Sequence, residues 1–256
     1  MQASEMAKPA EGKAAPKRRR AGLLIVLAVL LLAAAAVLFY TADYSHADAS
    51  ALRILSEGVP GVKIEQASDR IVFEPEEPEA GLIFYPGGKV EYTAYAPLMA
   101  ELSKEGILCV LLKMPLNLAV FGINAASGIP EAYPQIEYWM LAGHSLGGAM
   151  AASFAAKHAD ELDALVLLAA YSTADLTACG LDVLSVYGSE DGVLNREKYE
   201  KYRPNLPADV RETVIEGGCH AYFGAYGVQK GDGMPTISRG EQTARTVSEI
   251  LRLLPE

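Results

Sequence analysis

Short apolar runs alternate with helical patterns from about residue 70 to the end of the chain, and this alternation restricts the fold more than any other feature. Several of the apolar runs have no polar face, as in strands that helices cover on both sides. The alternation predicts an α/β protein with a doubly wound, mostly parallel sheet and right-handed crossovers. The expected helices cover residues 92–106, 146–160, 195–204 and 237–254. The expected strands are RIVFEP (70–75), GLIFYPG (81–87), GILCVLLKM (106–114), EYWMLAGHS (137–145), LDALVLLAA (162–170), LDVLSVYG (181–188) and DVRETVIEG (209–217).

The fourth of these runs ends in Gly143-His144-Ser145-Leu146-Gly147, which has the form G-x-S-x-G. Ligands of such sheets bind at the carboxyl ends of strands, where this serine lies. In a turn of this form the serine has a strained backbone, and the two glycines let neighbouring backbone pass close by. A chance glycine-rich turn is the alternative. The position between a buried strand and a small-residue helix favours Ser145 as a nucleophile.

A serine hydroxyl needs a base to take its proton. The chain has four histidines. His46 lies beside the N-terminal apolar run, His158 near a helix end, and His144 next to the serine but with its side chain expected to point away. His220, in EGGCHAYFG (216–224), follows the last expected strand. We therefore expect His220 to be the general base.

The histidine in turn needs a carboxylate that fixes its tautomer. The segment VYGSEDGVL (186–194) follows a strand and offers Asp191, with Glu190 as its neighbour. Asp191 is the expected acid because the Gly188-to-Asp191 spacing forms a turn that reaches back over the sheet. Asp175 is a weaker alternative, and a simple cap on the helix at 195–204 is the non-catalytic interpretation of Asp191.

Acyl transfer also needs N–H donors for the oxyanion. One expected donor is the backbone N–H of Leu146, directly after the serine. The second should come from the loop FYPGGKVEY (84–92), where Gly87 and Gly88 allow close approach of a substrate. The sequence does not distinguish between these two glycines.

Together, the order Ser145…Asp191…His220, the turn GHSLGG and the segments YGSEDG and PGG resemble the α/β-hydrolase superfamily over residues 70–256. The chain is most similar to compact, dienelactone-hydrolase-like members, although it has Ser where true dienelactone hydrolases have Cys. The segment 115–136 is short for the large lid of a lipase. The resemblance implies hydrolysis of an ester or related acyl bond through an acyl-enzyme, on a small-molecule substrate, with no metal or organic cofactor. Aromatic residues near the expected loops either line an acyl pocket or pack in the core: Tyr92, Tyr95, Tyr222, Phe223 and Tyr226.

Residues 21–40, AGLLIVLAVLLLAAAAVLFY, carry no charge and are long enough to span a bilayer as a helix. The preceding KRRR (17–20) predicts a cytoplasmic N-terminus and a catalytic domain outside the cell. A cleaved signal peptide is the alternative, but the run is long and ends in bulky residues, which favours an anchor. We therefore expect a basic tail (1–20), an anchor (21–40), a stalk and lead-in (41–68) and a catalytic domain (69–256).

After residue 20 the chain holds 16 Lys or Arg against 30 Asp or Glu. So acidic a domain argues against nucleic acid as a partner, because phosphate binding needs clustered basic residues. Cys109 is an expected apolar filler, while Cys179 and Cys219 can pair only in an oxidising compartment. The leading hypothesis is a membrane-anchored serine hydrolase. The alternatives are an acyltransferase or peptidase on the same three residues, or a catalytically silent binding domain.

Overall fold

The computed structural model describes residues 16–255, with side chains from residue 22 onward. The chain divides into two compact units after Asp43. In the first unit, α1 covers Pro16–Ala42. Its segment Gly22–Ala42 is long and apolar enough to cross a membrane, a property that N-terminal signal sequences share. The helix extends beyond the expected span of 21–40 at both ends, and residues 1–15 of the expected basic tail lie outside the described residues.

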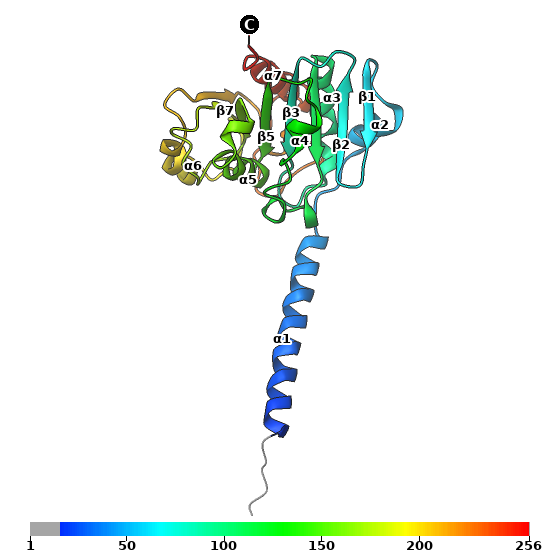
Figure 1. Cartoon of the computed structure of the whole chain (residues 1–256), viewed down its shortest axis with the longest axis vertical. Coiled ribbons are helices and arrows are strands. Elements are labelled where there is room, and N and C mark those ends of the chain that lie inside the picture. Colours follow the sequence, from blue (N-terminus) through cyan, green and yellow to red (C-terminus); the bar gives the residue numbers. More distant parts are fainter. Residues whose placement is uncertain (1–15, 256) are drawn as a thin grey trace, which may run out of the picture. The chain divides into compact units, whose positions relative to one another are not determined.

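The second unit, from Tyr44 onward, is one sheet with helices on both faces (Figure 1). Its strands are β1 (Val62–Gln66), β2 (Arg70–Pro75), β3 (Ala80–Tyr85), β4 (Ile107–Leu112), β5 (Trp139–His144), β6 (Ala164–Leu168), β7 (Asp182–Gly188) and β8 (Arg211–Ile215). Its α-helices are α2 (Ala49–Glu57), α3 (Ala96–Lys104), α4 (Ile129–Ala132), α5 (Leu146–Ala155), α6 (Arg196–Tyr202) and α7 (Arg239–Leu251). Short 3-10 turns occupy Tyr92–Tyr95 (η1), Pro115–Asn117 (η2), Ala119–Phe121 (η3), Ala159–Glu161 (η4), Arg203–Asn205 (η5) and Ala221–Phe223 (η6).

The strands lie in the order β1-β2-β4-β3-β5-β6-β7-β8. β2 is antiparallel to both of its neighbours, and β4, β3, β5, β6, β7 and β8 pair in parallel. All seven expected strands are present, which confirms the mostly parallel α/β sheet. β1 is an additional strand that lies inside the segment assigned to the stalk and lead-in, so the compact unit begins at Tyr44 rather than at residue 69.

The core lies in two layers, one on each face of the sheet. In β3, Leu82 and Phe84 belong to the layer under α3 and α7, whereas Ile83 and Tyr85 belong to the layer under α5. Every residue of β3, β4 and β5 is buried, as expected from sequences that are apolar except for His144 at the end of β5. Each buried aliphatic or aromatic side chain contributes about 1.5–3 kcal/mol to the stability of this frame. The core therefore holds the strand ends firmly in place.

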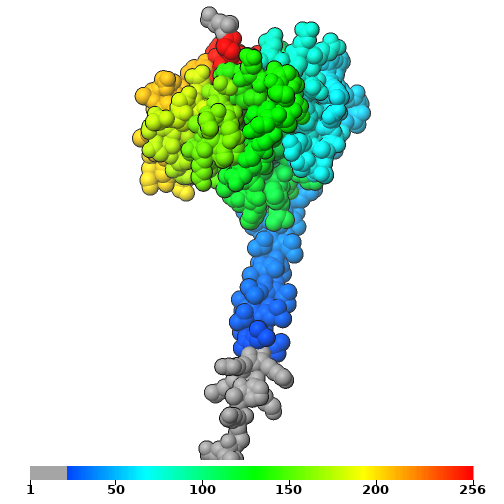
Figure 2. Space-filling view, viewed as in Figure 1, coloured from blue at the N-terminus to red at the C-terminus, as the bar shows by residue number. Residues whose placement is uncertain are grey.

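The parallel strands β3, β5, β6, β7 and β8 end at the same edge of the sheet, so the loops after them meet there. In the space-filling view the surface passes from the cyan residues of β1 and β2, through the green central part, to the yellow and orange residues that follow β7 (Figure 2). Cys109 is fully buried in β4, as expected for a filler, and Cys109, Cys179 and Cys219 are all free thiols. The conditional pairing of Cys179 with Cys219 is therefore not found.

Candidate active site

Ser145 lies in the sharp turn between β5 and α5, with φ 53° and ψ −122°. Its N–H donates to the carbonyl of Leu168 at the end of β6 (2.9 Å). A Cβ on Gly143 would come within 2.6 Å of the backbone of Gly147, and a Cβ on Gly147 would clash with the carbonyls of Tyr85 and Pro86. Only glycine fits at these two positions. The turn therefore holds the serine in a backbone conformation that L-residues rarely adopt.

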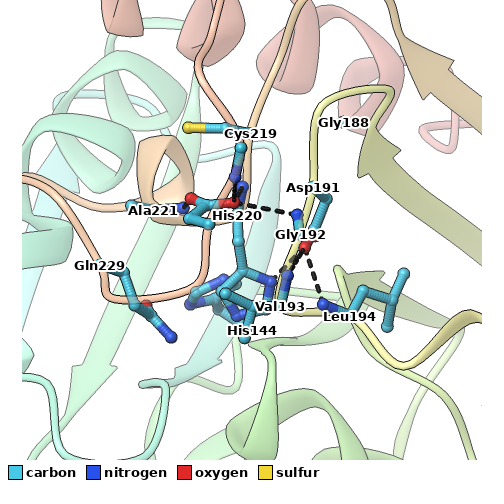
Figure 3. Close-up of polar contacts among 12 residues, drawn as sticks. His144, Gly188, Asp191, Gly192, Val193, Leu194, Cys219, His220, Ala221 and Gln229 are labelled. Atoms are coloured by element: carbon cyan, nitrogen blue, oxygen red, sulfur yellow. Dashed lines mark hydrogen bonds and ion pairs between the residues drawn. The ribbon is translucent and has the colours of Figure 1, made fainter.

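Asp191 and His220 are brought together by the loops after β7 and β8. The Nδ1 of His220 lies 2.9 Å from Oδ2 of Asp191, and both side chains are almost fully buried (Figure 3). The other carboxylate oxygen, Oδ1, accepts from the N–H groups of Val193 (2.9 Å) and Leu194 (2.7 Å). With the carboxylate ionised, Nδ1 carries the proton and Nε2 of His220 is free to accept one.

The charge on this carboxylate is stabilised by its surroundings. Burial raises the pKa of Asp191, but the hydrogen bond and charge of His220 and the N–H groups of Leu194 and Val193 outweigh that effect. The pKa of Asp191 is consequently below its ordinary value. An ionised Asp191 can both orient the imidazole and stabilise its protonated form.

Ser145 and His220 line the same pocket, which has a volume of about 240 Å³. Within the described part of the chain no hydrogen bond joins the serine hydroxyl to the imidazole. Such bonds are often long without substrate and tighten when it binds. Three residues that are far apart in the sequence thus converge at the carboxyl edge of the sheet.

In the loop after β3, the two glycines expected as oxyanion donors differ in whether their N–H groups are already hydrogen-bonded. The N–H of Gly87 donates to the hydroxyl of Tyr95 (3.0 Å) and so is not free for a substrate. Among the described residues no acceptor faces the N–H of Gly88, and a Cβ there would lie 2.8 Å from the side chain of Leu146. Leu146 begins α5, so its own N–H has no partner within the helix. The expectation for Gly87 is therefore corrected in favour of Gly88.

Tyr95 and His144 hold this loop in place through a chain of hydrogen bonds. The Tyr95 hydroxyl accepts from Gly87 and lies 2.8 Å from Nδ1 of His144, so its single proton goes to that nitrogen. Burial and the neighbouring His220 lower the pKa of His144 well below its ordinary value, which keeps this imidazole neutral. The ring of His144 packs against that of His220, with centroids 4.5 Å apart. His144 thus packs in the core as expected, but its ring lies against His220 instead of pointing away from the site.

Asp232 is a residue of the site that the sequence did not reveal. Its Oδ1 accepts from the N–H of His220 (3.1 Å) and of Gly192 (3.2 Å), and its Oδ2 accepts from Ala221 (2.8 Å). One carboxylate therefore links the loop of Asp191 to the loop of His220. Asp232 lies in the irregular segment GVQKGDGMP (227–235), where no periodic pattern or motif points to it.

Gln242 holds the histidine loop from the opposite side. This residue of α7 is fully buried, and its amide accepts from the N–H of Cys219 (2.9 Å) and donates to the carbonyl of the same residue (2.8 Å). The backbone just before His220 is thereby fixed. Burial and the charge of Asp232 raise the pKa of Cys219 to about 12, so this thiol stays protonated beside the site.

The remaining candidates from the sequence lie away from the pocket. Glu190 is exposed and accepts from Ser189, while Asp175 is exposed and caps Thr177. His158 pairs with Glu161 (2.8 Å), and His46 lies 3.3 Å from Glu91. The pocket is not lined by any of the five expected aromatic residues. Of these, Tyr95, Phe223 and Tyr226 are buried and Tyr92 and Tyr222 are half-buried, and all five pack in or against the core.

Comparisons with known proteins agree with this architecture. The model of the alpha/beta hydrolase family matches residues 81–244. The chain is similar in structure to TT1662 from Thermus thermophilus, with 15% identity, a TM-score of 0.57, and coverage of 76% of this chain and 99% of that one. It is also similar to MGS-MChE2, an alpha/beta hydrolase enzyme from a lagoon-sediment metagenome, with 14% identity, a TM-score of 0.57, and coverage of 74% and 98%. A search of curated protein sequences found no match.

Proposed function

Because the chain belongs to the alpha/beta hydrolase family, and is on that basis a hydrolase, we propose that it cleaves an ester or related acyl bond with Ser145, His220 and Asp191. The observation that carries this proposal is the buried hydrogen bond of 2.9 Å between Asp191 and the His220 imidazole, in the wall of the pocket that Ser145 also lines. A serine, a base and a carboxylate that orients the base form the constellation that acyl transfer requires.

In the proposed reaction the Ser145 oxygen attacks the acyl carbonyl carbon while Nε2 of His220 takes the hydroxyl proton. The carbonyl oxygen becomes an oxyanion that the N–H groups of Leu146 and Gly88 stabilise. When the bond to the leaving group breaks, the His220 imidazolium gives its proton to the departing alcohol. Water then attacks the acyl-enzyme with His220 again as base, which releases the acid and restores Ser145.

The N–H donors are expected to supply a large part of the rate. The loss of one oxyanion donor typically costs about 3 kcal/mol of transition-state stabilisation. The positive end of the α5 dipole adds to the same effect, because α5 begins directly after the serine. The fixed turn at Ser145 and the link between Gly87 and Tyr95 hold both donors in place before substrate binds.

The test is hydrolysis of p-nitrophenyl acetate by the full chain, purified in a nonionic detergent. We expect saturable release of p-nitrophenol that Ser145→Ala abolishes and that His220→Gln reduces by at least a thousandfold. Glu190→Gln is the matched control, because Glu190 adjoins the catalytic acid in sequence but lies on the surface. A folded wild-type chain without activity on any simple ester, or full activity in Ser145→Ala, would contradict the proposal.

We also propose that α1 anchors the enzyme in a membrane, with the catalytic domain on the outer side. The length and apolar character of Gly22–Ala42 and the basic residues 17–20 support this orientation. Protease treatment of intact cells is expected to degrade the domain of the full-length chain. Complete protection, with cleavage only after lysis, would place the domain in the cytoplasm.

A further inference from the structure

The pocket at Ser145 is small, and most of its lining residues are aliphatic. Tyr171 and Asn195 line it beside Ser145 and His220, and its aliphatic lining residues are Leu146, Ala149, Ala169, Ala170, Val193 and Leu194. Among the described residues that line it there is no Asp, Glu, Lys or Arg, although the domain as a whole is strongly acidic. Such a lining suits an uncharged group, because a charged group would lose its hydration without gaining an Asp, Glu, Lys or Arg side chain of opposite charge.

The walls of this pocket are fixed by the catalytic machinery. Val193 and Leu194 donate their N–H groups to Oδ1 of Asp191, so this wall cannot move outward without breaking the contacts of the catalytic acid. On the opposite side α5 packs tightly against the end of β6, where a Cβ on Gly148 would lie 2.5 Å from the Cβ of Ala170. The pocket therefore has little room to expand around a larger group.

We infer that the enzyme takes esters of short, uncharged acyl groups, and that this pocket limits the acyl chain to about six carbons. The inference rests on the proposed function. A volume of about 240 Å³ holds about eight non-hydrogen groups if each takes ~30 Å³, the volume of one molecule in liquid water. The reacting carbonyl occupies part of that space. The pocket lies on the β6 and β7 side of Ser145, whereas Gly88 lies on the β3 side. The acyl chain can thus extend into the pocket while its carbonyl oxygen faces the N–H donors.

The test is a series of p-nitrophenyl esters from acetate to decanoate, hydrolysed by the full chain in one fixed nonionic detergent. We expect kcat/KM to rise by up to about fourfold per added methylene, the value for transfer out of water, and to fall beyond about six carbons. A second series keeps the acetyl group and lengthens the alcohol instead. There we expect no comparable limit.

Two variants move the limit in opposite directions. Ala149→Leu fills part of the pocket and should lower the ratio of kcat/KM for hexanoate to that for acetate by at least tenfold. Val193→Ala enlarges the pocket and should raise the ratio for octanoate to hexanoate. Ala156→Leu is the control, because Ala156 is exposed at the end of the same helix and should leave both ratios unchanged. Circular dichroism and thermal unfolding establish that each variant is folded, and ratios cancel the effect of detergent on long esters.

The outcomes separate this inference from the proposed function. Activity that stays level or increases up to decanoate, or ratios that Ala149→Leu leaves unchanged, would overturn the inference while the esterase activity stands. A length limit in the alcohol series alone would assign the pocket to the leaving group and overturn the acyl assignment. If the folded wild-type chain hydrolyses no ester in either series, the proposed function is wrong, and the inference fails with it.

Discussion

Replacing Ser145 by glycine should stabilise the fold relative to replacing it by alanine. Ser145 has φ 53° and ψ −122°, a conformation that costs a residue with a Cβ about 1–3 kcal/mol. Both substitutions remove the hydroxyl, so the comparison isolates the Cβ. Glycine in turn adds entropy to the unfolded chain, which costs about 0.5–1 kcal/mol. The expected difference in the free energy of unfolding therefore lies between about 0 and ~2.5 kcal/mol in favour of Ser145→Gly.

The assay is urea unfolding of the full chain in detergent, followed by the fluorescence of Trp139. This tryptophan is buried at the start of β5 and is the only one in the chain. Ala149→Gly serves as the control, since Ala149 lies in the regular part of α5, where glycine should cost about 1 kcal/mol. If Ser145→Gly is less stable than Ser145→Ala by an amount similar to this control, the turn stores no strain and the reasoning is refuted.

Three further predictions concern groups around the imidazole. Asp191→Asn should keep the fold but lower kcat for p-nitrophenyl acetate by roughly 10³–10⁴, as loss of the orienting carboxylate does in serine proteases, and near-wild-type activity would exclude Asp191 as the acid. Asp232→Asn should lower kcat roughly tenfold with little change in KM and should shift the pH profile of kcat/KM, because its carboxylate positions the backbone of His220. His144 is neutral when folded but binds a proton near pH 6.5 when unfolded. The free energy of unfolding should therefore fall by up to ~1.4 kcal/mol per pH unit below about pH 6.5, and His144→Gln should weaken that dependence in urea titrations at several pH values.

The central sheet could be predicted from the sequence because its strands are apolar on both faces. β3, β4 and β5 are buried at every position. Their own apolar sequences are sufficient to predict this burial. β1 could not be found in the same way. This edge strand, VKIEQ, is short and partly exposed, and it is held by pairing with β2, an interaction that its own sequence does not encode.

In the candidate site, too, some residues could be predicted from the sequence and others only from the folded structure. Asp191 and His220 follow strands whose ends meet at one edge, so their positions along the chain predicted that the two side chains lie close together, and their 2.9 Å contact agrees with this. The choice between Gly87 and Gly88 depends on where the Tyr95 hydroxyl lies, which is a property of the folded core. Asp232 accepts hydrogen bonds from backbone N–H groups of two loops, and one of these donors, Gly192, lies 40 residues away in the sequence. Because every residue except proline has a backbone N–H, the sequence does not indicate which of them Asp232 binds.

The proposed mechanism depends most on the activation of Ser145 by His220. The direct measurement is the rate of labelling of the full chain by a fluorophosphonate probe, with the modified residue identified by mass spectrometry of peptides. This mechanism predicts a single adduct, on Ser145, that is absent in Ser145→Ala and forms at least a hundredfold more slowly in folded His220→Ala. An adduct on another residue, or labelling of Ser145 at an undiminished rate without His220, would contradict it.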